Sequence, residues 1–593
     1  MLIFHPAFAG GVWDRLDLSH PGLETVAAYC ASNDYSGAAS ALLDYYRSRK
    51  EIVTPEIPDP ANVDISVSEE KMVKDAMEHR FFVEKGYEVY FYGDDINWRY
   101  WPIHDNELRW QLHRHKWFTP MGQAFRVSGN EEYAREWARQ YLDWIVKNPL
   151  IESGSSETEY AGNMSLSDVR ENMRFAWRPL EVSHRVRDQI FQFQLFIDSE
   201  AFTSEFLVTF LENYYRHADY LLHHFSKKGN HLLFQAQRIL YAGAFFTEFK
   251  DAELWRRTGI DILNREILAQ VYPDGCQWEL DPHYHLACTN IFCKALEMAS
   301  LCGMRGEFPS AYTERLEKMM EFYANISYPD YQPPCFSDER LTEKSIIISD
   351  FECWSNLFPS NGYLRWMATE GKEGYEPPYL SVGYLDSGFF VFRTSRKMDA
   401  VQMVVKAGPP GEWHCQPDNG TFELWYKGRQ LFPDSGSYVY GGGAEVMKWR
   451  NLFRSTAFHN TVTLDGKDLE TTNSRTLLWK PEGRQQKLVT ENPSYPGLTH
   501  RRTISFIGGK KIVIKDELIG EATGKIALHL HPGPDAMQYF HLRVKGPREM
   551  VARQEQGWVS YHIREKLPRP HLIWEVDKLT KKSVVFTTYI DLL

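Results

Sequence analysis

The spacing of hydrophobic residues changes once along this 593-residue chain, close to Gly371. Before that point, apolar residues recur at the three- and four-residue intervals of amphipathic helices, as in the stretch 254–271. After it, short runs alternate with period two between Gly- and Pro-containing turns, which is typical of antiparallel strands. Because one hydrophobic core rarely organises so long a chain, we expect a helical domain over 1–372 and an antiparallel β-sandwich over 373–593.

The same patterns predict individual elements on both sides of this change. Further helices are expected at 33–47, 130–146, 202–225 and 232–249. Strands are expected at 389–392, 400–405, 421–426, 460–464, 503–507, 511–515 and 526–531.

The overall charge argues against nucleic acid as a partner. The formal net charge is −12 with the 21 His neutral, so the chain has no global positive field, and an anionic substrate would need a locally basic cleft. The eight Cys form no CxxC pair, which gives no support to a zinc ribbon or a redox motif. No stretch reaches the roughly 20 apolar residues of a membrane span, so we expect no membrane insertion.

The segment KKGNHLLFQAQR is the first of three that carry candidate chemistry. Asn230 and His231 follow a basic Lys-Lys-Gly turn and begin a predicted helix. Exposed amides and cations at a helix start favour anions. The alternative is an Asn that caps the helix beside a surface His.

The second segment, YPDGCQWELDPHYHLACTN, is dense in titratable groups before an apolar helix. It contains Asp274, Glu279 and Asp281, and it places Tyr284 between two His. A Tyr flanked by imidazoles or cations can act first as a base and then as an acid when its pKa is lowered. The alternative is a turn and a helix cap in which the Tyr only packs.

The third segment, GEWHCQPDNGTFELWYKGRQLFPDSG, is followed by a further His in FHNTVTLDG. His414 or His459, with Gln416 and Asp434, would make a mixed oxygen and nitrogen metal site. Because these residues are far apart in the sequence, the spacing alone favours a polar loop without metal.

Several motifs together resemble heparinase III-type heparan-sulfate lyases of the heparinase II/III-like superfamily. They are GNHLLFQAQR, DGCQWELDPHYH, PPGEWHCQPDNGTFELWYKGR, FHNTVTLD, DINWRYWPIHDNELRWQLHRHKWF and WRPLEVSHRV, which occur in family order over nearly the whole chain. The resemblance implies an α+β multidomain fold, with an N-terminal incomplete α/α toroid followed by a C-terminal antiparallel β-sandwich.

The resemblance also implies roles for the candidate residues. Asn230 would bind the substrate carboxylate, Tyr284 would transfer protons and His414 would be a second proton-transfer group. Gln416, Asp434 and His459 would hold one divalent metal ion, calcium or zinc, with a structural role. Where relatives carry an H-x-H motif, this chain has Gln416 at the second position.

The substrate implied by the resemblance is heparan sulfate or a heparin-like glycosaminoglycan. Candidates for holding it are His231, Arg109, Arg114 and Arg238, because Arg matches sulfate and carboxylate oxygens. The resemblance further implies a monomer that is periplasmic or secreted in a bacterium.

Three other interpretations stay open on the sequence. The first is a lyase for alginate or chondroitin. The second is an inverting glycoside hydrolase with Asp274 and Glu279 or Asp281 as its acid and base. The third is a non-catalytic glycan-binding protein, which would tolerate the loss of Tyr284.

Overall fold

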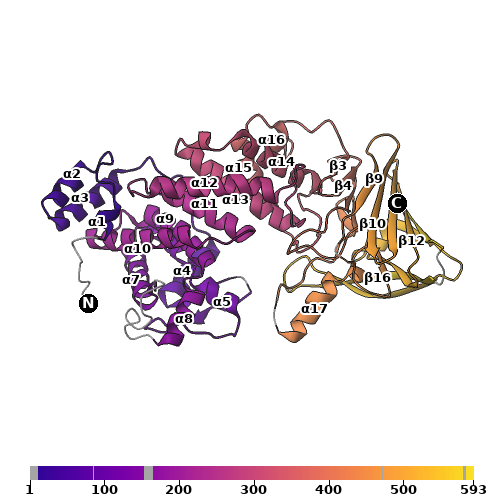
Figure 1. The fold of residues 1–593 in the computed structure, drawn as a ribbon, viewed down its shortest axis with the longest axis horizontal. Helices are drawn as coiled ribbons and strands as arrows, with labels where there is room; N and C mark the ends of the chain where they lie inside the picture. The colour runs from indigo at the N-terminus through magenta and orange to yellow at the C-terminus, as the bar shows by residue number, and fades with distance from the viewer. Residues whose placement is uncertain (1–10, 85, 152–164, 442, 471, 579–581) are drawn as a thin grey trace. The chain divides into compact units, whose positions relative to one another are not determined.

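The computed structural model describes residues 11–84, 86–151, 165–441, 443–470, 472–578 and 582–593 (Figure 1). Its α-helices are α1 (Val12–Arg15), α2 (Glu24–Ala31), α3 (Tyr35–Ser48), α4 (Val67–Met77), α5 (Asn106–Leu112), α6 (Phe118–Ser128), α7 (Glu131–Lys147), α8 (Leu166–Phe175), α9 (Pro179–Phe196), α10 (Ser204–His223), α11 (Asn230–Phe245), α12 (Ala252–Gln270), α13 (Pro282–Leu301), α14 (Ser310–Ile326), α15 (Lys344–Leu357), α16 (Gly362–Ala368) and α17 (Ala444–Arg454).

The strands follow mainly after the helices. They are β1 (Arg80–Phe81), β2 (Tyr90–Phe91), β3 (Val382–Tyr384), β4 (Phe389–Arg393), β5 (Val401–Lys406), β6 (Phe422–Tyr426), β7 (Arg429–Phe432), β8 (Val462–Leu464), β9 (Arg475–Lys480), β10 (Gln485–Tyr495), β11 (Leu498–Ile507), β12 (Lys511–Gly520), β13 (Gly524–Leu530), β14 (Phe540–Lys545), β15 (Val551–Val559), β16 (Leu567–Lys578) and β17 (Val584–Leu592).

The described residues form two compact units. The first contains the chain up to Arg265 together with Lys294–Pro309, and the second contains Glu266–Cys293 and Ser310–Leu593. The expected order of helices followed by antiparallel strands is confirmed, since the helices run to Ala368 and β3 begins at Val382. The compact units divide the chain elsewhere, so the boundary at 372/373 stays a prediction.

The first unit is built around α9 and α11, which are buried along most of their length and pack against each other. Pro179 at the first turn of α9 suits a helix start, because its missing N–H has no intrahelical acceptor there. Arg185 of α9 is buried, and its guanidinium donates to the carbonyls of His113 and Ala176 and to the ring of His217. This buried cation therefore ties α9 to the ends of two earlier segments.

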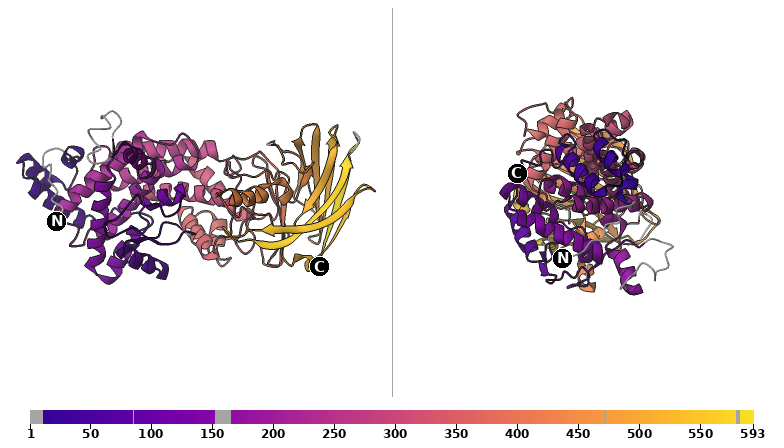
Figure 2. Two further views of the ribbon diagram at one scale, coloured as in Figure 1. Left: turned by 90° about the horizontal axis from the view of Figure 1, so that it is seen from below. Right: turned by 90° about the vertical axis from the view of Figure 1, so that its left-hand side faces the viewer.

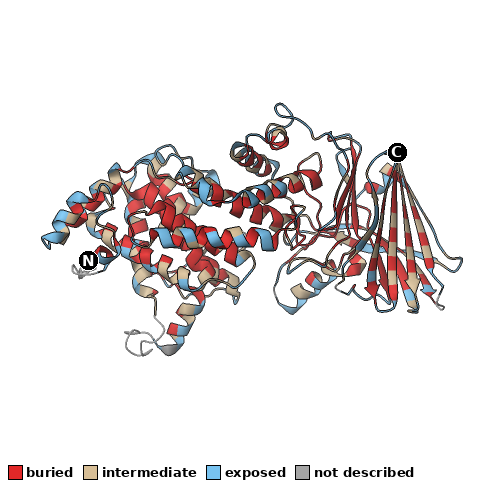
Figure 3. Ribbon diagram, turned by 45° about the horizontal axis from the view of Figure 1, so that its top comes forward, coloured by how far each residue is buried: buried red, intermediate tan, exposed pale blue. Residues whose placement is uncertain are grey.

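The second unit contains three antiparallel sheets (Figure 2). The orders are β14-β17-β12-β11-β10-β9, β15-β16-β13-β8 and β3-β4-β5-β6-β7. The long strands alternate between buried and more exposed positions, as Figure 3 shows, so each presents one face to a core. By contrast, β4, β5 and β6 are buried at every position.

Both faces of the five-stranded sheet are covered, which explains the continuous burial of β4 to β6. On one face, Phe392 and Leu424 pack against Phe506 and Ile514 of the six-stranded sheet. Residues on its other face include Val404 and Trp425, which pack with Phe322 and Ile326 of α14. The loops that leave these strands are therefore held on a rigid base.

The helices and strands expected from the sequence are confirmed, with ends that shift by a few residues. The segment expected at 202–225 is α10 (Ser204–His223), and the one expected at 232–249 is α11 (Asn230–Phe245). No helix among the described residues is long and apolar enough to cross a membrane.

His285 fixes the start of α13 to its surroundings. Its Nδ1 accepts a hydrogen bond from the backbone N–H of Gln277 at 3.2 Å, and its Nε2 donates to the carbonyl of Met319 at 2.9 Å. Burial lowers the pKa of this imidazole from 6.5 to about 4, against the opposing effect of the Met319 hydrogen bond. The ring is therefore neutral in the folded protein at neutral pH.

We predict that His285 makes folding acid-sensitive. The unfolded chain binds the proton near pH 6.5 but the folded chain only near pH 4, so stability falls as the pH falls through this window, by up to about 1.4 kcal/mol per pH unit. The free energy of unfolding in urea should drop more steeply for the wild type than for His285→Gln. His223→Gln, which alters an exposed side chain, is the matched control. Equal slopes for His285→Gln and the wild type would contradict the prediction.

Candidate active site

The start of α11 carries Asn230 and His231 in the first unit. Asn230 is the first helical residue, and Gly229 before it has a φ of 78°, a conformation that glycine adopts without a steric penalty. Loss of hydration around the ring, followed by the charges of Arg178 and Arg114, lowers the pKa of His231. A neutral His231 beside two cations and a helix N-terminus makes this a positive, hydrogen-bonding surface.

Arg114 and Arg178 are oriented by one buried carboxylate. Arg114 Nη2 lies 2.9 Å from Glu181 Oε1, and Arg178 Nη1 lies 3.4 Å from the same oxygen. The Arg178 guanidinium also stacks on Trp110 at 3.9 Å. In the same unit Arg114 lines a pocket of about 680 Å³ that also contains His184.

Two other expected substrate-binding residues are buried. Arg109 is 1% exposed, pairs with Glu171 and stacks on Phe175. Arg238 is 2% exposed and lies against Phe234 and the side-chain amide of Gln237. Neither guanidinium faces solvent, so a direct role in binding substrate would require these contacts to open and stays a prediction.

Tyr284 belongs to the second unit, in the first turn of α13. The carboxylate of Asp281, just before the helix, accepts the N–H of Tyr284 at 3.0 Å and the N–H of Asp338 at 2.6 Å. Burial, followed by the charge of Asp281, raises the pKa of the Tyr284 phenol above its ordinary value. The phenol is therefore protonated at neutral pH in the unliganded protein.

His414 stacks directly on Tyr284. The two ring centroids are 3.6 Å apart, and the ring planes differ by 13°. His414 Nδ1 lies 2.9 Å from Asp338 Oδ2, and the imidazole keeps 27% of its surface exposed. The structure thus brings together the two proton-transfer candidates of the second unit, from segments 130 residues apart in the sequence.

Asp338 and Arg450 were missed in the sequence analysis. Arg450, from α17, makes a two-pronged ion pair with Asp338 through Nη1–Oδ1 at 2.6 Å and Nη2–Oδ2 at 2.7 Å. Both residues are buried. The contact joins segments 112 positions apart, and no spacing rule in a single sequence points to it. The only local signal was the Asp-Glu-Arg run that begins at Asp338.

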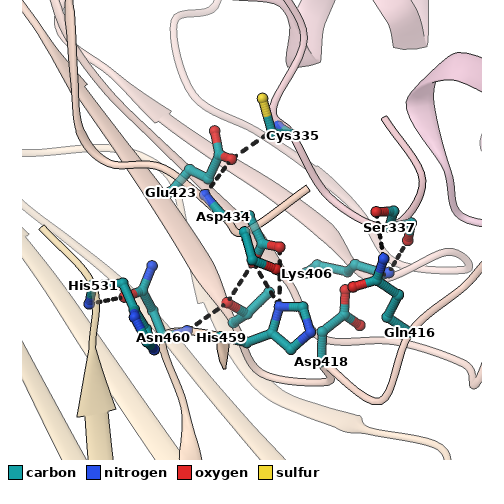
Figure 4. Close-up of polar contacts among 12 residues, drawn as sticks. Cys335, Ser337, Lys406, Gln416, Asp418, Glu423, Asp434, His459, Asn460 and His531 are labelled. Carbon is teal, nitrogen blue, oxygen red and sulfur yellow. Dashed lines mark hydrogen bonds and ion pairs between the residues drawn. The ribbon is translucent and has the colours of Figure 1, made fainter. Parts of the chain in front are cut away.

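Buried polar contacts hold the loop that carries His414 in place (Figure 4). Lys406 Nζ pairs with Asp418 Oδ2 and donates to Ser337 Oγ, both at 2.8 Å. Gln416 Nε2 donates to the carbonyl of Ser337 at 2.6 Å. These buried contacts fix the loop between β5 and β6 to the segment that carries Asp338.

Gln416, Asp434 and His459 offer donors that suit a divalent cation. Gln416 Oε1 is buried and has no hydrogen-bond partner among the described residues. His459 Nδ1 lies 3.0 and 2.9 Å from the two Asp434 oxygens. This is the separation of a hydrogen bond. Tetrahedral zinc ligands about 2.0–2.2 Å from the ion would lie about 3.3–3.6 Å apart, so binding an ion would require the two side chains to move slightly apart.

His459 has an acceptor at each ring nitrogen. Nδ1 faces the Asp434 carboxylate, and Nε2 lies 3.4 Å from the carbonyl of Arg454. Burial would lower the pKa of His459, but the charge and hydrogen bond of Asp434 outweigh it and raise the pKa. The ring therefore donates from Nδ1 to Asp434, and a bound cation would have to replace that proton.

The carboxylates expected for a hydrolase have structural partners. Asp274 Oδ2 accepts hydrogen bonds from the N–H of Asp386 at 3.0 Å and from the N–H and hydroxyl of Ser387 at 2.8 and 3.0 Å. The oxygens of Asp281 are occupied by two backbone N–H groups, as described above. This geometry favours turn and cap roles for both residues.

Trp413, immediately before His414, is an exposed aromatic residue on this loop. Its side chain is 75% exposed, and its φ of 31° is a strained conformation for a non-glycine residue. The indole thus offers a flat apolar surface on the same loop as His414, a surface suited to a sugar ring.

Comparisons with known proteins agree with the motifs over almost the entire chain. The Heparinase II/III N-terminus family model matches residues 12–366, and the Heparinase II/III-like C-terminal model matches 376–578. The chain is 54% identical to a heparin-sulfate lyase of Bacteroides stercoris, over 98% of this chain and 89% of that protein. It is 41% identical to a heparin-sulfate lyase of Pedobacter heparinus, with the same coverage.

Solved structures show the same likeness in three dimensions. A heparinase III with methylated lysines is 53% identical, with a TM-score of 0.87 over 98% of this chain and 93% of that one. A second heparinase III structure is 29% identical, with a TM-score of 0.88 and the same coverage. The expected fold class, an α/α toroid followed by an antiparallel β-sandwich, is thereby confirmed. The chain belongs to the heparinase II/III family.

Proposed function

We propose that this chain is a lyase that cleaves heparan sulfate at glucosamine–uronate linkages by β-elimination, leaving unsaturated uronate ends. The observation that carries the proposal is the stack of a protonated Tyr284 on His414, in a chain whose relatives are named heparin-sulfate lyases. A phenol and an imidazole at one point supply an acid and a base. The monomeric state and the secreted or periplasmic location stay predictions.

Elimination begins with the substrate carboxylate. The proton at C5 is too weakly acidic while the neighbouring carboxylate keeps its full charge. In our proposal Asn230 and His231 bind this carboxylate and stabilise the enolate that develops on it, as an oxyanion hole does. One such donor is typically worth about 2.7–4 kcal/mol in the transition state.

Proton transfer completes the reaction. A base takes the C5 proton, the electron pair forms the C4–C5 double bond, the C4–oxygen bond breaks, and the leaving oxygen takes a proton from an acid. In glucuronate the C5 proton and the C4 oxygen are on the same side, so Tyr284 can serve both after losing its own proton. In iduronate they are on opposite sides, and His414 is then the base while Tyr284 is the acid.

The raised pKa of Tyr284 has a direct consequence for this scheme. A protonated phenol is ready to act as the acid, because its proton is present at neutral pH. Acting as the base requires that the phenol first be deprotonated. The scheme therefore predicts faster elimination at iduronate than at glucuronate unless substrate binding lowers the pKa of the Tyr284 phenol.

Binding of a sulfated chain would rest on local cations and exposed aromatic surface. Arg114 and Arg178 are held at the surface by Glu181 and match sulfate and carboxylate oxygens. They supply local positive charge in a chain whose net charge is −12. The exposed indole of Trp413 would stack on a sugar next to the cleaved linkage.

We predict that Tyr284→Phe abolishes elimination while the protein stays folded. Absorbance from unsaturated uronates should rise when the wild type is mixed with heparan sulfate. The rate of this rise should be at least about 10²-fold lower for the variant. Tyr375→Phe, which alters an exposed phenol, should match the wild type. Reducing ends formed without absorbance would instead identify a hydrolase. Equal or faster reaction on alginate or chondroitin would identify a different uronate substrate.

We also propose a structural divalent cation, calcium or zinc, held by Gln416, Asp434 and His459. The proposal is supported by the unpaired Gln416 oxygen and by the burial of all three side chains. The cation would supply positive charge that holds the ends of three loop segments together. It takes no part in the proton transfers above, which involve Tyr284 and His414.

Removal of this cation should lower both stability and activity. A bound ion stabilises the folded state by about 2.7 kcal/mol when its concentration is 100 times its dissociation constant. Chelation should therefore lower the melting temperature and the rate on heparan sulfate, and the cation should restore both. Asp434→Asn should lose the metal, measured by elemental analysis, whereas Asp516→Asn in the β-sandwich should retain it. A metal-free protein with unchanged melting temperature and rate would contradict the proposal.

A further inference from the structure

We propose that Asp338 is a positioning residue that fixes the tautomer and orientation of His414, and that Arg450 holds Asp338 in place. The inference rests on the proposed role of His414 as a base. It gives a role to two residues that neither the motifs nor the resemblance singled out.

The contacts of Asp338 account for each of its hydrogen-bonding groups. Oδ1 accepts from Arg450 Nη1 at 2.6 Å, with Gln416 Nε2 at 3.4 Å, and Oδ2 accepts from Arg450 Nη2 at 2.7 Å. His414 Nδ1 is 2.9 Å from Oδ2, and the backbone N–H donates to Asp281. These contacts hold the carboxylate in one position relative to His414.

The ionised state of Asp338 is secured by the same partners. The carboxylate has no exposed surface, and its two oxygens lie 2.6 and 2.7 Å from the two Nη atoms of Arg450. Such a two-pronged pair with a guanidinium is made by the ionised carboxylate. An ionised carboxylate only accepts hydrogen bonds, so the proton of a neutral His414 must lie on Nδ1.

This tautomer leaves Nε2 of His414 as the free base. With Nδ1–H bonded to Asp338, the lone pair is on Nε2, on the side of the ring away from the carboxylate. The ring cannot turn without breaking both this bond and its stack on Tyr284. The Asp–Arg pair therefore prepares His414 to accept a proton in one direction.

Replacing Asp338 with Asn should remove the fixed tautomer. An amide has only one oxygen, so whichever way it turns, its NH₂ faces one of the two Arg450 N–H donors and the two-pronged pair is lost. Where the NH₂ takes the place of Oδ2, it donates to His414 Nδ1. The proton of the imidazole then lies on Nε2, which no longer acts as the base.

The test is a double-mutant cycle on the full-length chain. Rates of unsaturated-uronate formation are compared for wild type, Asp338→Asn, His414→Ala and the double variant, on glucuronate-rich and iduronate-rich heparan sulfate. Asp338→Asn should lower kcat by about 10²- to 10⁴-fold on iduronate linkages, with little change in KM. The double variant should be no slower than His414→Ala, because Asp338 acts only through that ring.

A matched control separates positioning from stability. Asp516 is also buried and contacts an arginine and a histidine, with Oδ1 2.6 Å from Arg502 Nε and 2.7 Å from His500 Nε2. It belongs to β12 in the β-sandwich. Asp516→Asn should lower the melting temperature but leave kcat unchanged. When it is combined with His414→Ala, the effects of the two substitutions on kcat should multiply.

A spectroscopic readout covers the case in which Asp338→Asn does not fold. Protein labelled with ¹⁵N-histidine, with His414 assigned by the signals lost in His414→Gln, reports which ring nitrogen carries the proton. Protonated Nδ1 in the neutral ring supports the proposal, whereas protonated Nε2 overturns it. If the losses of rate from Asp338→Asn and His414→Ala multiply in the double variant, the proposal is overturned as well. A wild type without any unsaturated product would overturn the proposed function itself.

Discussion

The buried carboxylate of Asp281 links the segments of the second unit that carry Tyr284 and Asp338. One of its oxygens accepts the N–H of Tyr284 and the other accepts the N–H of Asp338. The first contact sets the beginning of α13, and the second sets the segment whose side chain reaches His414 and Arg450. Leaving a buried backbone donor unpaired costs about 1–3 kcal/mol, so losing Asp281 would release both segments. The Tyr284–His414 stack depends on this shared acceptor, although Asp281 itself needs no contact with substrate.

Much of the fold could be predicted from the sequence, because its signals are local. The helical repeat in 254–271 and the alternation in 511–515 identify α12 and β12, and the change of period marks the change of architecture. Both faces of β4 to β6 are buried, so their sequences are nearly all apolar and do not alternate. The packing partners of such strands cannot be inferred from period alone.

The candidate site could be predicted only in part. Motifs singled out Tyr284 and His414, but the contact between their rings joins segments far apart in the sequence. Asp338 and Arg450 belong to no local sequence pattern, because their role depends on the ion pair that they form in the folded chain. Arg109 illustrates the opposite difficulty, because a cation at a helical position looks the same whether it faces solvent or stacks on Phe175. Burial of such residues is decided by tertiary packing.

Electrostatics in this chain are local rather than global. The chain is acidic overall, and Arg114 and Arg178 share the buried Glu181, while Glu107 lies 3.7 Å from Arg114. In the second unit, two buried carboxylates are each paired with one cation, in the Lys406–Asp418 and Arg450–Asp338 pairs. Buried pairs of this kind contribute little net stability, but they place side chains in one geometry. That is what proton transfer between fixed groups requires.

Mass spectrometry of the products from a defined heparan sulfate tetrasaccharide distinguishes cleavage of the glycosidic linkage by elimination from cleavage by hydrolysis. Elimination adds no atoms, so the masses of the two products should sum to that of the substrate. The double bond should lie in the uronate at the new non-reducing end of the fragment from the reducing side of the cleaved linkage. A sum that exceeds the substrate by one water molecule would mean hydrolysis and would contradict the account.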